Sequence, residues 1–198
     1  MPKGEATRTA ILDQALDLAS ELGLEGLTLG ALAKQAEMSK SGLYAHFGSK
    51  EELQVQVLHA AADRFTKVVL TKAFSEPRGL PRIRVMFEGW LTWGEQEFPG
   101  GCPFIAAAAE FDDRPGAVRD VLTDHIGKML EMMSRAARFA VDEGHFHPGL
   151  DPDQFAYEYW ALLLAHHHYC RLLRNEETDT RTRRAFESLI ARAANPNA

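Results

Sequence analysis

Small and polar residues occupy positions 39–42, where the chain reads Ser-Lys-Ser-Gly. Hydroxyl, ammonium and main-chain amide groups bond to phosphates and base edges, and small side chains let them come close. These residues begin a short helical pattern that ends near Phe47, and another short pattern, residues 29–36, precedes them. Two short helices joined over residues 36–38 have the spacing of a helix-turn-helix, whose second helix enters the major groove of DNA.

A run of three histidines, His166-His167-His168, is the second feature whose residue types could do chemistry. Consecutive helix positions point about 100° apart, so the three imidazoles cannot face one ion. A metal would need a further ligand, such as Cys170, four residues after His166, or His125. We therefore predict no metal site and no cofactor. No nucleophile elbow, phosphate-binding loop or HExxH pattern occurs, so we also predict that the protein is not an enzyme.

Helical periodicity extends over nearly the whole chain. Before the motif, apolar residues recur every three or four positions from Thr7 to Leu22. After it, Ser49–Glu52 predicts a capping box, in which the Ser49 hydroxyl accepts a hydrogen bond from the amide of residue 52 and the Glu52 carboxylate reaches back. This box begins a long helix with an apolar stripe to Val68. Later helices are expected over residues 85–93, 104–111, 117–141, 152–173 and 181–194.

No stretch alternates apolar and polar residues for long enough to predict a strand. The sequence predicts an all-α fold of about nine helices. We expect an N-terminal helix-turn-helix DNA-binding domain over residues 1–52. A helical ligand-binding and dimerisation domain is expected over residues 53–198.

The charge of the chain excludes a generally polybasic nucleic-acid binder. The 198 residues carry 22 Lys and Arg against 28 Asp and Glu, a net charge of −6. Residues 1–58 hold five bases and eight acids, so the predicted DNA-binding part is not basic either. DNA affinity would depend on a few placed cations and on helix dipoles, and dimerisation would double the set of contacts.

The sequence also indicates the compartment. No apolar run approaches the roughly 18 residues of a membrane helix, and the first ten residues lack the apolar region of a signal peptide. We therefore expect a cytoplasmic protein without a membrane partner. Cys102 and Cys170 are the only cysteines, and we expect free thiols, although a single bridge between them is the alternative.

The motif and its flanks resemble the tetracycline-repressor (TetR) family of bacterial transcription regulators. The matching features are Ile11-Leu12 through Ala19, Leu27-Thr28, Leu32-Ala33, Ala36, Ser39–Phe47 (SKSGLYAHF) and Ser49–Leu53 (SKEEL). They span about Thr7–Leu58. Beyond them the chain agrees with the family in length and helical layout, and its GGCPF and DPDQFA stretches are similar to C-terminal regions of one branch.

This resemblance implies a set of DNA contacts. Thr28 would bond a phosphate, residues 39–42 would meet base edges or flanking phosphates, and Lys50 would clamp a phosphate at the next helix start. Capping alone is the alternative role for Thr28 and Ser39, and packing is the alternative for Tyr44. The implied contacts are Thr28, Ser39, Lys40, Ser41, Gly42, Tyr44, His46 and Lys50.

Large apolar side chains in the second half suggest a ligand pocket with a few polar handles. Ordinary core packing is the alternative for each. The pocket candidates are Trp90, Trp93, Phe104, His125, Met129, Met133, Tyr159 and His166. The last two predicted helices are expected to pair across a dimer as a four-helix bundle, with an intramolecular core as the alternative. The interface candidates are Leu163, Phe186, Leu189 and Ile190.

Together these features predict a homodimeric repressor that leaves a palindromic DNA operator when a small-molecule effector binds. The effector is expected to be largely hydrophobic. One alternative is a helical small-molecule sensor without operator binding, and another is a transcriptional activator of the same fold.

Overall fold

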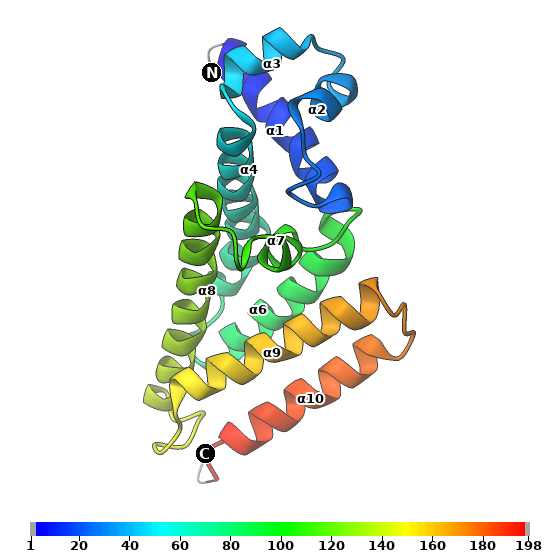
Figure 1. Ribbon diagram of the computed structural model, residues 1–198. Coiled ribbons are helices and arrows are strands. Elements are labelled where there is room, and N and C mark those ends of the chain that lie inside the picture. Colours follow the sequence, from blue (N-terminus) through cyan, green and yellow to red (C-terminus); the bar gives the residue numbers. More distant parts are fainter. Residues whose placement is uncertain (1–2, 197–198) are drawn as a thin grey trace. The chain divides into compact units, whose positions relative to one another are not determined.

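The computed structural model describes residues 3–196, with side chains described from Thr7 onward. In chain order the helices are α1 (Lys3–Leu22), α2 (Leu29–Gln35), α3 (Lys40–Phe47), α4 (Lys50–Phe65), α5 (Thr71–Ser75), α6 (Leu80–Thr92), α7 (Pro103–Phe111), α8 (Ala117–Asp142), α9 (Pro152–Arg171) and α10 (Thr178–Ala193) (Figure 1). Within these residues the β pairing is limited to an isolated bridge between Phe146 and Ala194. The predicted all-α fold is confirmed.

Two π-helical segments interrupt the regular helices. Segment η1 (Thr66–Leu70) joins α4 to α5, and η2 (Trp93–Glu97) continues α6. When each segment is counted with the helices it continues, the described residues contain nine helices, as the sequence predicts. The π segments themselves were not predicted, because a wider turn shifts an apolar stripe by only one residue and leaves its composition unchanged.

Most helix bounds agree with the sequence patterns. Helix α6 begins at Leu80, five residues before the expected start at residue 85. The start of α10 also differs. This helix begins at Thr178, three residues before the expected start at Arg181. The Thr178 hydroxyl donates to the main-chain oxygen of Asn175 at 2.6 Å, and the Asn175 side chain accepts from the amide of Glu177. These local bonds begin the helix in a stretch that has no apolar periodicity.

The described residues pack into two compact units. Unit 1 contains the residues up to Phe65 together with Gln96–His125, and unit 2 contains Thr66–Glu95 together with the residues from Ile126 onward. The domain boundary predicted at residue 52 divides the chain by function and not by packing, and it remains a prediction.

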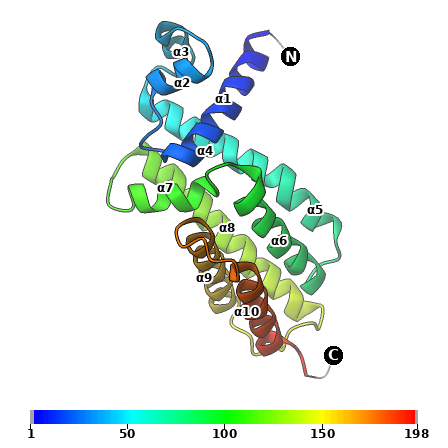
Figure 2. The same ribbon diagram turned by 90° about the vertical axis from the view of Figure 1, so that its right-hand side faces the viewer.

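Unit 1 is built on the packing of α1 against α2, α4 and α7 (Figures 1 and 2). Its core includes Leu27, Leu32, Leu43 and Leu53, each 0% exposed. Burying a leucine side chain contributes about 1.5–3 kcal/mol, so these residues hold the short helices α2 and α3 in place.

A close backbone contact explains the glycine that follows Pro99. The amide of Gly100 donates to the Ser20 hydroxyl at 3.0 Å. A Cβ atom on Gly100 would lie 1.7 Å from the main-chain oxygen of Ser20, so only glycine permits this approach to α1.

Unit 2 has an aromatic core between α6, α9 and α10. The rings of Phe87 and Phe186 stack with centroids 3.8 Å apart, and Tyr159 meets both rings edge-on. Helices α9 and α10 lie side by side in both ribbon views (Figures 1 and 2). In the described part of the chain, no helix has both the length and the apolar character needed to cross a membrane.

Candidate functional site

The helix-turn-helix predicted from the sequence is present. A tight turn joins α2 to α3, with Glu37 at a φ of 52°. The Met38 amide bonds to the main-chain oxygen of Ala33 at 3.0 Å, and Leu32 and Leu43 are fully buried between the two helices. The turn and this core fix the direction in which α3 presents its outer face.

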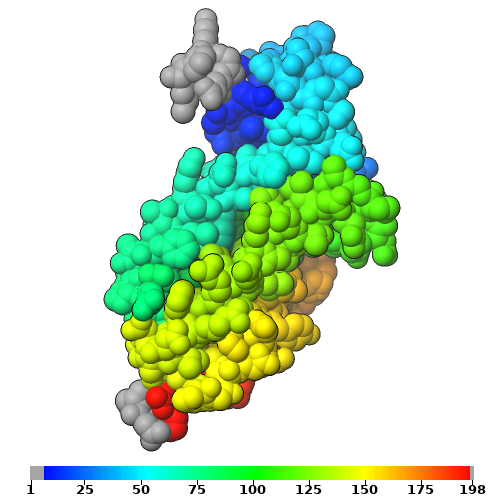
Figure 3. All heavy atoms as spheres, turned by 90° about the vertical axis from the view of Figure 1, so that its left-hand side faces the viewer, coloured from blue at the N-terminus to red at the C-terminus, as the bar shows by residue number. Residues whose placement is uncertain are grey.

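The outer face of α3 is open to solvent. Lys40, Ser41 and Tyr44 are exposed, Tyr44 to 61%, and the surface of residues 28–50 is visible at one end of unit 1 (Figure 3). Gly42 and His46 are half-buried on the same helix. The exposed polar groups of α3 can therefore reach a macromolecule without any change in the packing of unit 1.

Thr28 and Ser39 cap the two helices of the motif. The Thr28 hydroxyl accepts from the amide of Ala31 at 3.0 Å, and the Ser39 hydroxyl accepts from the amide of Gly42 at 3.1 Å. A hydroxyl that accepts a cap bond retains its hydrogen for donation. Capping by these residues is thus compatible with the phosphate contacts that the sequence implies for them.

Lys40 lies beside the N-terminus of α2. A Cβ atom on Gly30 would lie 3.2 Å from Cε and 3.4 Å from Nζ of Lys40, and 3.8 Å from Oγ1 of Thr28. Glycine at position 30 therefore leaves room for the ammonium group next to the Thr28 hydroxyl. Sequence reasoning nominated Thr28 and Lys40 separately but missed Gly30, because this role comes from a contact between two helices.

Lys50 is engaged within unit 1. Its Nζ lies 2.6 Å from the main-chain oxygen of Glu25 and 3.1 Å from the Glu25 carboxylate. A hydrogen bond from Lys50 lowers the pKa of Glu25, and the positive charges of Lys50 and Arg114 act in the same direction. The charge of Lys50 is therefore shared with an acid, and a phosphate would compete with that acid for it.

The capping box at the start of α4 is present only in part. The Ser49 hydroxyl accepts from the Glu52 amide at 3.0 Å, as predicted. The Glu52 carboxylate instead accepts from the Gln56 amide group at 2.6 Å, and Gln56 accepts from Arg8. Competition from Gln56, one turn further along the helix, explains the difference.

The eight predicted pocket residues fall into both units. In unit 1, the rings of Phe104 and His125 lie 5.9 Å apart, and His125 Nε2 lies 3.0 Å from His59 Nδ1. The six in unit 2 are at most 7% exposed; they are Trp90, Trp93, Met129, Met133, Tyr159 and His166. Their role in ligand binding stays a prediction.

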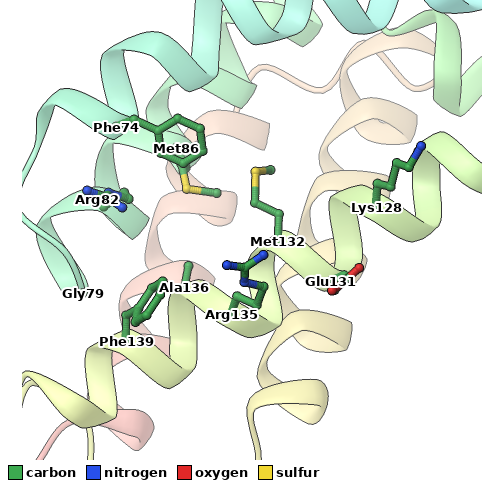
Figure 4. A pocket seen from close by; sticks show the side chains of 10 residues that line it. All are labelled: Phe74, Gly79, Arg82, Met86, Lys128, Glu131, Met132, Arg135, Ala136 and Phe139. Atoms are coloured by element: carbon green, nitrogen blue, oxygen red, sulfur yellow. The ribbon is translucent and has the colours of Figure 1, made fainter.

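A cavity of about 370 Å³ lies within unit 2, between α5, α6 and α8 (Figure 4). Its apolar lining includes Phe74, Met86, Met132 and Phe139, and its charged lining consists of Arg82, Lys128, Arg135 and Glu131. Three cations against one acid make this cavity electropositive. None of its lining residues is among the eight predicted pocket residues, because the cavity is formed by side chains from three separate helices.

Two arginines contribute guanidinium groups to the cavity. The Arg82 guanidinium donates to the main-chain oxygen of Glu76 and lies over the Phe74 ring, while its Nε is buried without a hydrogen-bond partner. Arg135 has no hydrogen-bond or ion-pair partner among the described residues. Both guanidinium groups therefore have donors to offer to a bound molecule.

The four predicted interface residues lie inside unit 2. Leu163, Phe186, Leu189 and Ile190 are 1–5% exposed in the single chain. Large exposed apolar residues instead gather at the outer side and end of α9. There are eight such residues among those described, and five of them are Tyr157, Leu164, Tyr169, Leu172 and Leu173.

The three consecutive histidines have three different environments. His166 is buried, His167 is half-buried and His168 is exposed. Burial lowers the pKa of His167 to about 4, so its imidazole is neutral at neutral pH. The three imidazoles therefore do not face a common point, as the helical spacing predicts.

This geometry defines the class of helix-turn-helix proteins that carry a second, all-helical unit. A model described as bacterial regulatory proteins of the tetR family matches residues 11–57. A model described as the C-terminal domain of tetracyclin repressor-like proteins matches residues 79–186. The chain belongs to the tetracycline-repressor family.

Individual relatives agree with this assignment. The chain is 35% identical over 60 residues to the IcaR negative transcriptional regulator of the biofilm operon icaADBC from Staphylococcus aureus, covering 30% of this chain and 32% of IcaR. It thus spans about a third of that curated relative.

Two solved structures share the fold. A TetR transcriptional regulator from Chloroflexus aurantiacus has a TM-score of 0.84 at 24% identity, covering 96% of both chains. AibR in complex with isovaleryl coenzyme A and operator DNA has a TM-score of 0.71 at 21% identity, covering 96% of this chain and 99% of AibR.

Proposed function

We propose that the protein is a cytoplasmic, homodimeric transcriptional repressor that binds a palindromic operator and releases it when a small-molecule effector binds. The observation that carries the proposal is the exposed face of α3, with Lys40 and the Thr28 hydroxyl side by side around Gly30. Repression rather than activation is supported by IcaR, which is described as a negative regulator. We propose a regulatory role without catalysis.

Charge limits how this surface binds DNA. Each neutralised phosphate contributes a slope of about −0.9 to the salt dependence of binding. Lys40 is exposed, whereas Lys50 is paired with Glu25. One subunit therefore offers few cations, and we infer that affinity comes from two copies on two half-sites about 34 Å apart.

The second copy is proposed to cover the exposed apolar side of α9. The four interface residues predicted from the sequence are already buried in the protomer, where they would support the interface from inside unit 2; they are Leu163, Phe186, Leu189 and Ile190. Tyr157, Leu164 and Leu172 recur at spacings of seven and eight residues on α9 or directly after it, and each is at least 38% exposed. A stripe of this kind buries apolar area when it meets its own copy across a two-fold axis.

The electropositive cavity is proposed as the effector site. Its volume of about 370 Å³ falls in the range of small-molecule pockets. Apolar walls would hold a hydrocarbon portion, and Arg82 and Arg135 would bind a carboxylate or phosphate. The chemistry of the lining thus refines the expected hydrophobic effector to an anionic amphiphile.

The effector would act by shifting a conformational equilibrium. A ligand changes DNA affinity only if it binds one conformation better than the other. Residues 50–75 form one continuous helical run, which starts at Lys50 and includes Phe74 of the cavity wall. Segment η1 lies within this run, and π turns often occur at functional points of a helix. We propose that this run transmits effector binding to the helix-turn-helix.

Selection of DNA ligands tests the proposal directly. Repeated gel-shift selection from random duplex DNA should enrich a palindromic sequence, whose binding is then measured by fluorescence anisotropy at several salt concentrations. Lys40→Ala should weaken binding to all sequences and reduce the salt slope by about 1. Lys34→Ala, which removes an exposed lysine of α2 outside the proposed contact set, is the matched control. Failure to enrich any sequence would refute operator binding.

A further inference from the structure

Unit 2 contains a group of three side chains whose types bind metal ions: Glu95, His166 and Cys170. The His166 Nε2 atom lies 3.0 Å from Oε1 of Glu95 and 3.6 Å from Sγ of Cys170. Sγ lies 3.8 Å from the same Glu95 oxygen. Among the residues that the structure describes, these three place one ligand atom each close enough together to bind a single ion.

We propose that Glu95, His166 and Cys170 form a metal-binding site for a borderline divalent cation, Zn²⁺. Carboxylate, imidazole and thiolate are all zinc ligands, and tetrahedral Zn²⁺ has bonds of about 2.0–2.3 Å to them. Those bond lengths place neighbouring ligand atoms about 3.3–3.6 Å apart. The observed distances of 3.0, 3.6 and 3.8 Å lie on both sides of that range, so shifts of a few tenths of an ångström would bring the three atoms to it.

The backbone brings the three groups together in a specific way. His166 and Cys170 are four residues apart on α9 and therefore share one face of the helix. Glu95 lies in the π-helical segment η2, which continues α6. The contact therefore depends on a π turn, a local form that is frequent at functional sites.

A second shell orients the imidazole. The Nδ1 atom of His166 lies 3.1 Å from Oγ1 of Thr182 on α10, and both residues are buried. When Nδ1–H donates to that hydroxyl, the Nε2 lone pair faces Glu95 and Cys170. Metal-bound histidines almost always have such a partner on the other ring nitrogen.

The carboxylate of Glu95 is not neutralised by a fixed cation. Glu88 on α6 pairs with Arg183, and Glu97 pairs with Arg64. Glu95 has no Lys or Arg partner among the described residues, and its ion-pair contact is with His166. A cation bound here would supply the missing charge. Glu95 is exposed and Cys170 is half-buried, so solvent can supply a fourth ligand.

Binding would exchange protons for the metal. Burial and the negative charge of Glu95 raise the pKa of the Cys170 thiol, so the metal-free site holds the proton on sulfur. On binding, an S–Zn bond replaces the S–H bond, and the proton held between His166 Nε2 and Glu95 leaves Nε2, whose lone pair then binds the metal while Nδ1–H donates to Thr182. The displaced protons go to solvent. His166 binds through Nε2 as a neutral imidazole, and Glu95 binds as a carboxylate, so no oxidant or reductant is needed.

Cobalt titration of the purified, chelator-treated protein tests the site without DNA or effector. The wild-type chain should bind one Co²⁺ per protomer with a thiolate-to-cobalt charge-transfer band and the strong visible bands of four-coordinate cobalt. Zn²⁺ should then displace the cobalt. Cys170→Ser should abolish the charge-transfer band, whereas His168→Gln, on the exposed neighbour, should leave it intact.

Thr182→Val separates an orienting role from a structural one. It should lower metal affinity about 10- to 100-fold while retaining the charge-transfer band. Circular dichroism checks the fold of each variant. The proposal is overturned if wild-type protein shows no charge-transfer band, if Cys170→Ser retains it, or if His168→Gln weakens binding as much as His166→Gln does. If a variant fails to fold, the result of the wild-type titration alone decides whether the metal site exists.

Discussion

The ammonium of Lys50 donates to the main-chain oxygen of Glu25 at 2.6 Å and pairs with the carboxylate of the same residue at 3.1 Å. This double contact ties the first turn of α4 to the segment that precedes α2. It also places an acid where a DNA phosphate would need the same cation. Glu25 is therefore an internal competitor for the proposed phosphate contact.

Replacing Glu25 with Gln should strengthen operator binding. The substitution removes the competing charge but leaves the main-chain oxygen that positions Lys50, so the salt slope should steepen by up to about 1. Glu21→Gln removes the same charge from an exposed position of α1 and serves as the control in anisotropy titrations. Equal gains in both variants would assign the effect to net charge and not to Lys50.

The same ion pair has a defined pH dependence. Because the pKa of Glu25 is lowered in the folded protein, the pair stabilises the fold above the pKa of the unfolded chain. It is lost as the pH falls through the lowered value. Both side chains are exposed, so the contribution to stability is small.

Gly30→Ala should separate stability from DNA binding. Alanine in a helix is favoured over glycine by about 1 kcal/mol, so the melting temperature should hold or rise. The new Cβ would lie 3.2 Å from Cε of Lys40 and shift that side chain by a few tenths of an ångström, so operator affinity should fall. Gly127→Ala on α8 is the matched control, because its Cβ would meet open space. Unchanged DNA affinity in Gly30→Ala would show that Lys40 is not positioned by this contact.

The sequence predicted the features that depend on local order. Caps at Thr28, Ser39 and Ser49 and the apolar stripes follow from residue types at fixed spacing, and the structure contains them. Features that join distant segments were not predicted. The Lys50–Glu25 pair links positions 25 residues apart, and the cavity arginines lie on two separate helices.

The histidine run illustrates the same limit. Helical spacing was sufficient to reject three consecutive ligands and to identify Cys170 as a partner of His166. It could not supply Glu95, which lies 71 residues away from His166 in the chain. The π turn that contains Glu95 cannot be predicted from the pattern of apolar residues.

Charges on the exposed side of α9 should separate the dimer. Leu164→Glu with Leu172→Glu places two acids among residues that are 38% and 69% exposed in the protomer, so the fold should persist. Sedimentation should show a monomer, and operator binding should be lost with the second half-site. Leu22→Glu, at an α1 residue that is 53% exposed, is the control. A dimer that survives the double substitution would place the interface elsewhere.

The cavity should prefer anionic amphiphiles. Decanoate, decylamine and decanol share one hydrocarbon chain and differ only in the head group, so thermal shifts with the three compounds isolate the effect of charge. Decanoate should stabilise the protein most, and Arg135→Ala should reduce its affinity about 10- to 100-fold, the equivalent of about 1.5–3 kcal/mol for a charged hydrogen bond. Arg138→Ala on α8 is the control, since Arg138 is absent from the cavity lining. Equal stabilisation by the amine would contradict the proposed effector class.

Tyr159 carries a buried hydroxyl without a hydrogen-bond partner, and this predicts an unusual alkaline behaviour. Burial, together with the negative charge of Glu88, raises the pKa of Tyr159 far above its usual value of about 10. The folded chain keeps this proton while the unfolded chain loses it, so the free energy of unfolding should fall as the pH rises above about 10.

Tyr159→Phe should leave stability at neutral pH unchanged or raise it by about 1 kcal/mol, because an unpaired polar group is removed. Denaturant melts at neutral and alkaline pH measure the difference, which should widen with pH; Tyr44→Phe, at a 61% exposed residue, should show no such trend. A loss of several kcal/mol in Tyr159→Phe would show that the hydroxyl has a partner after all.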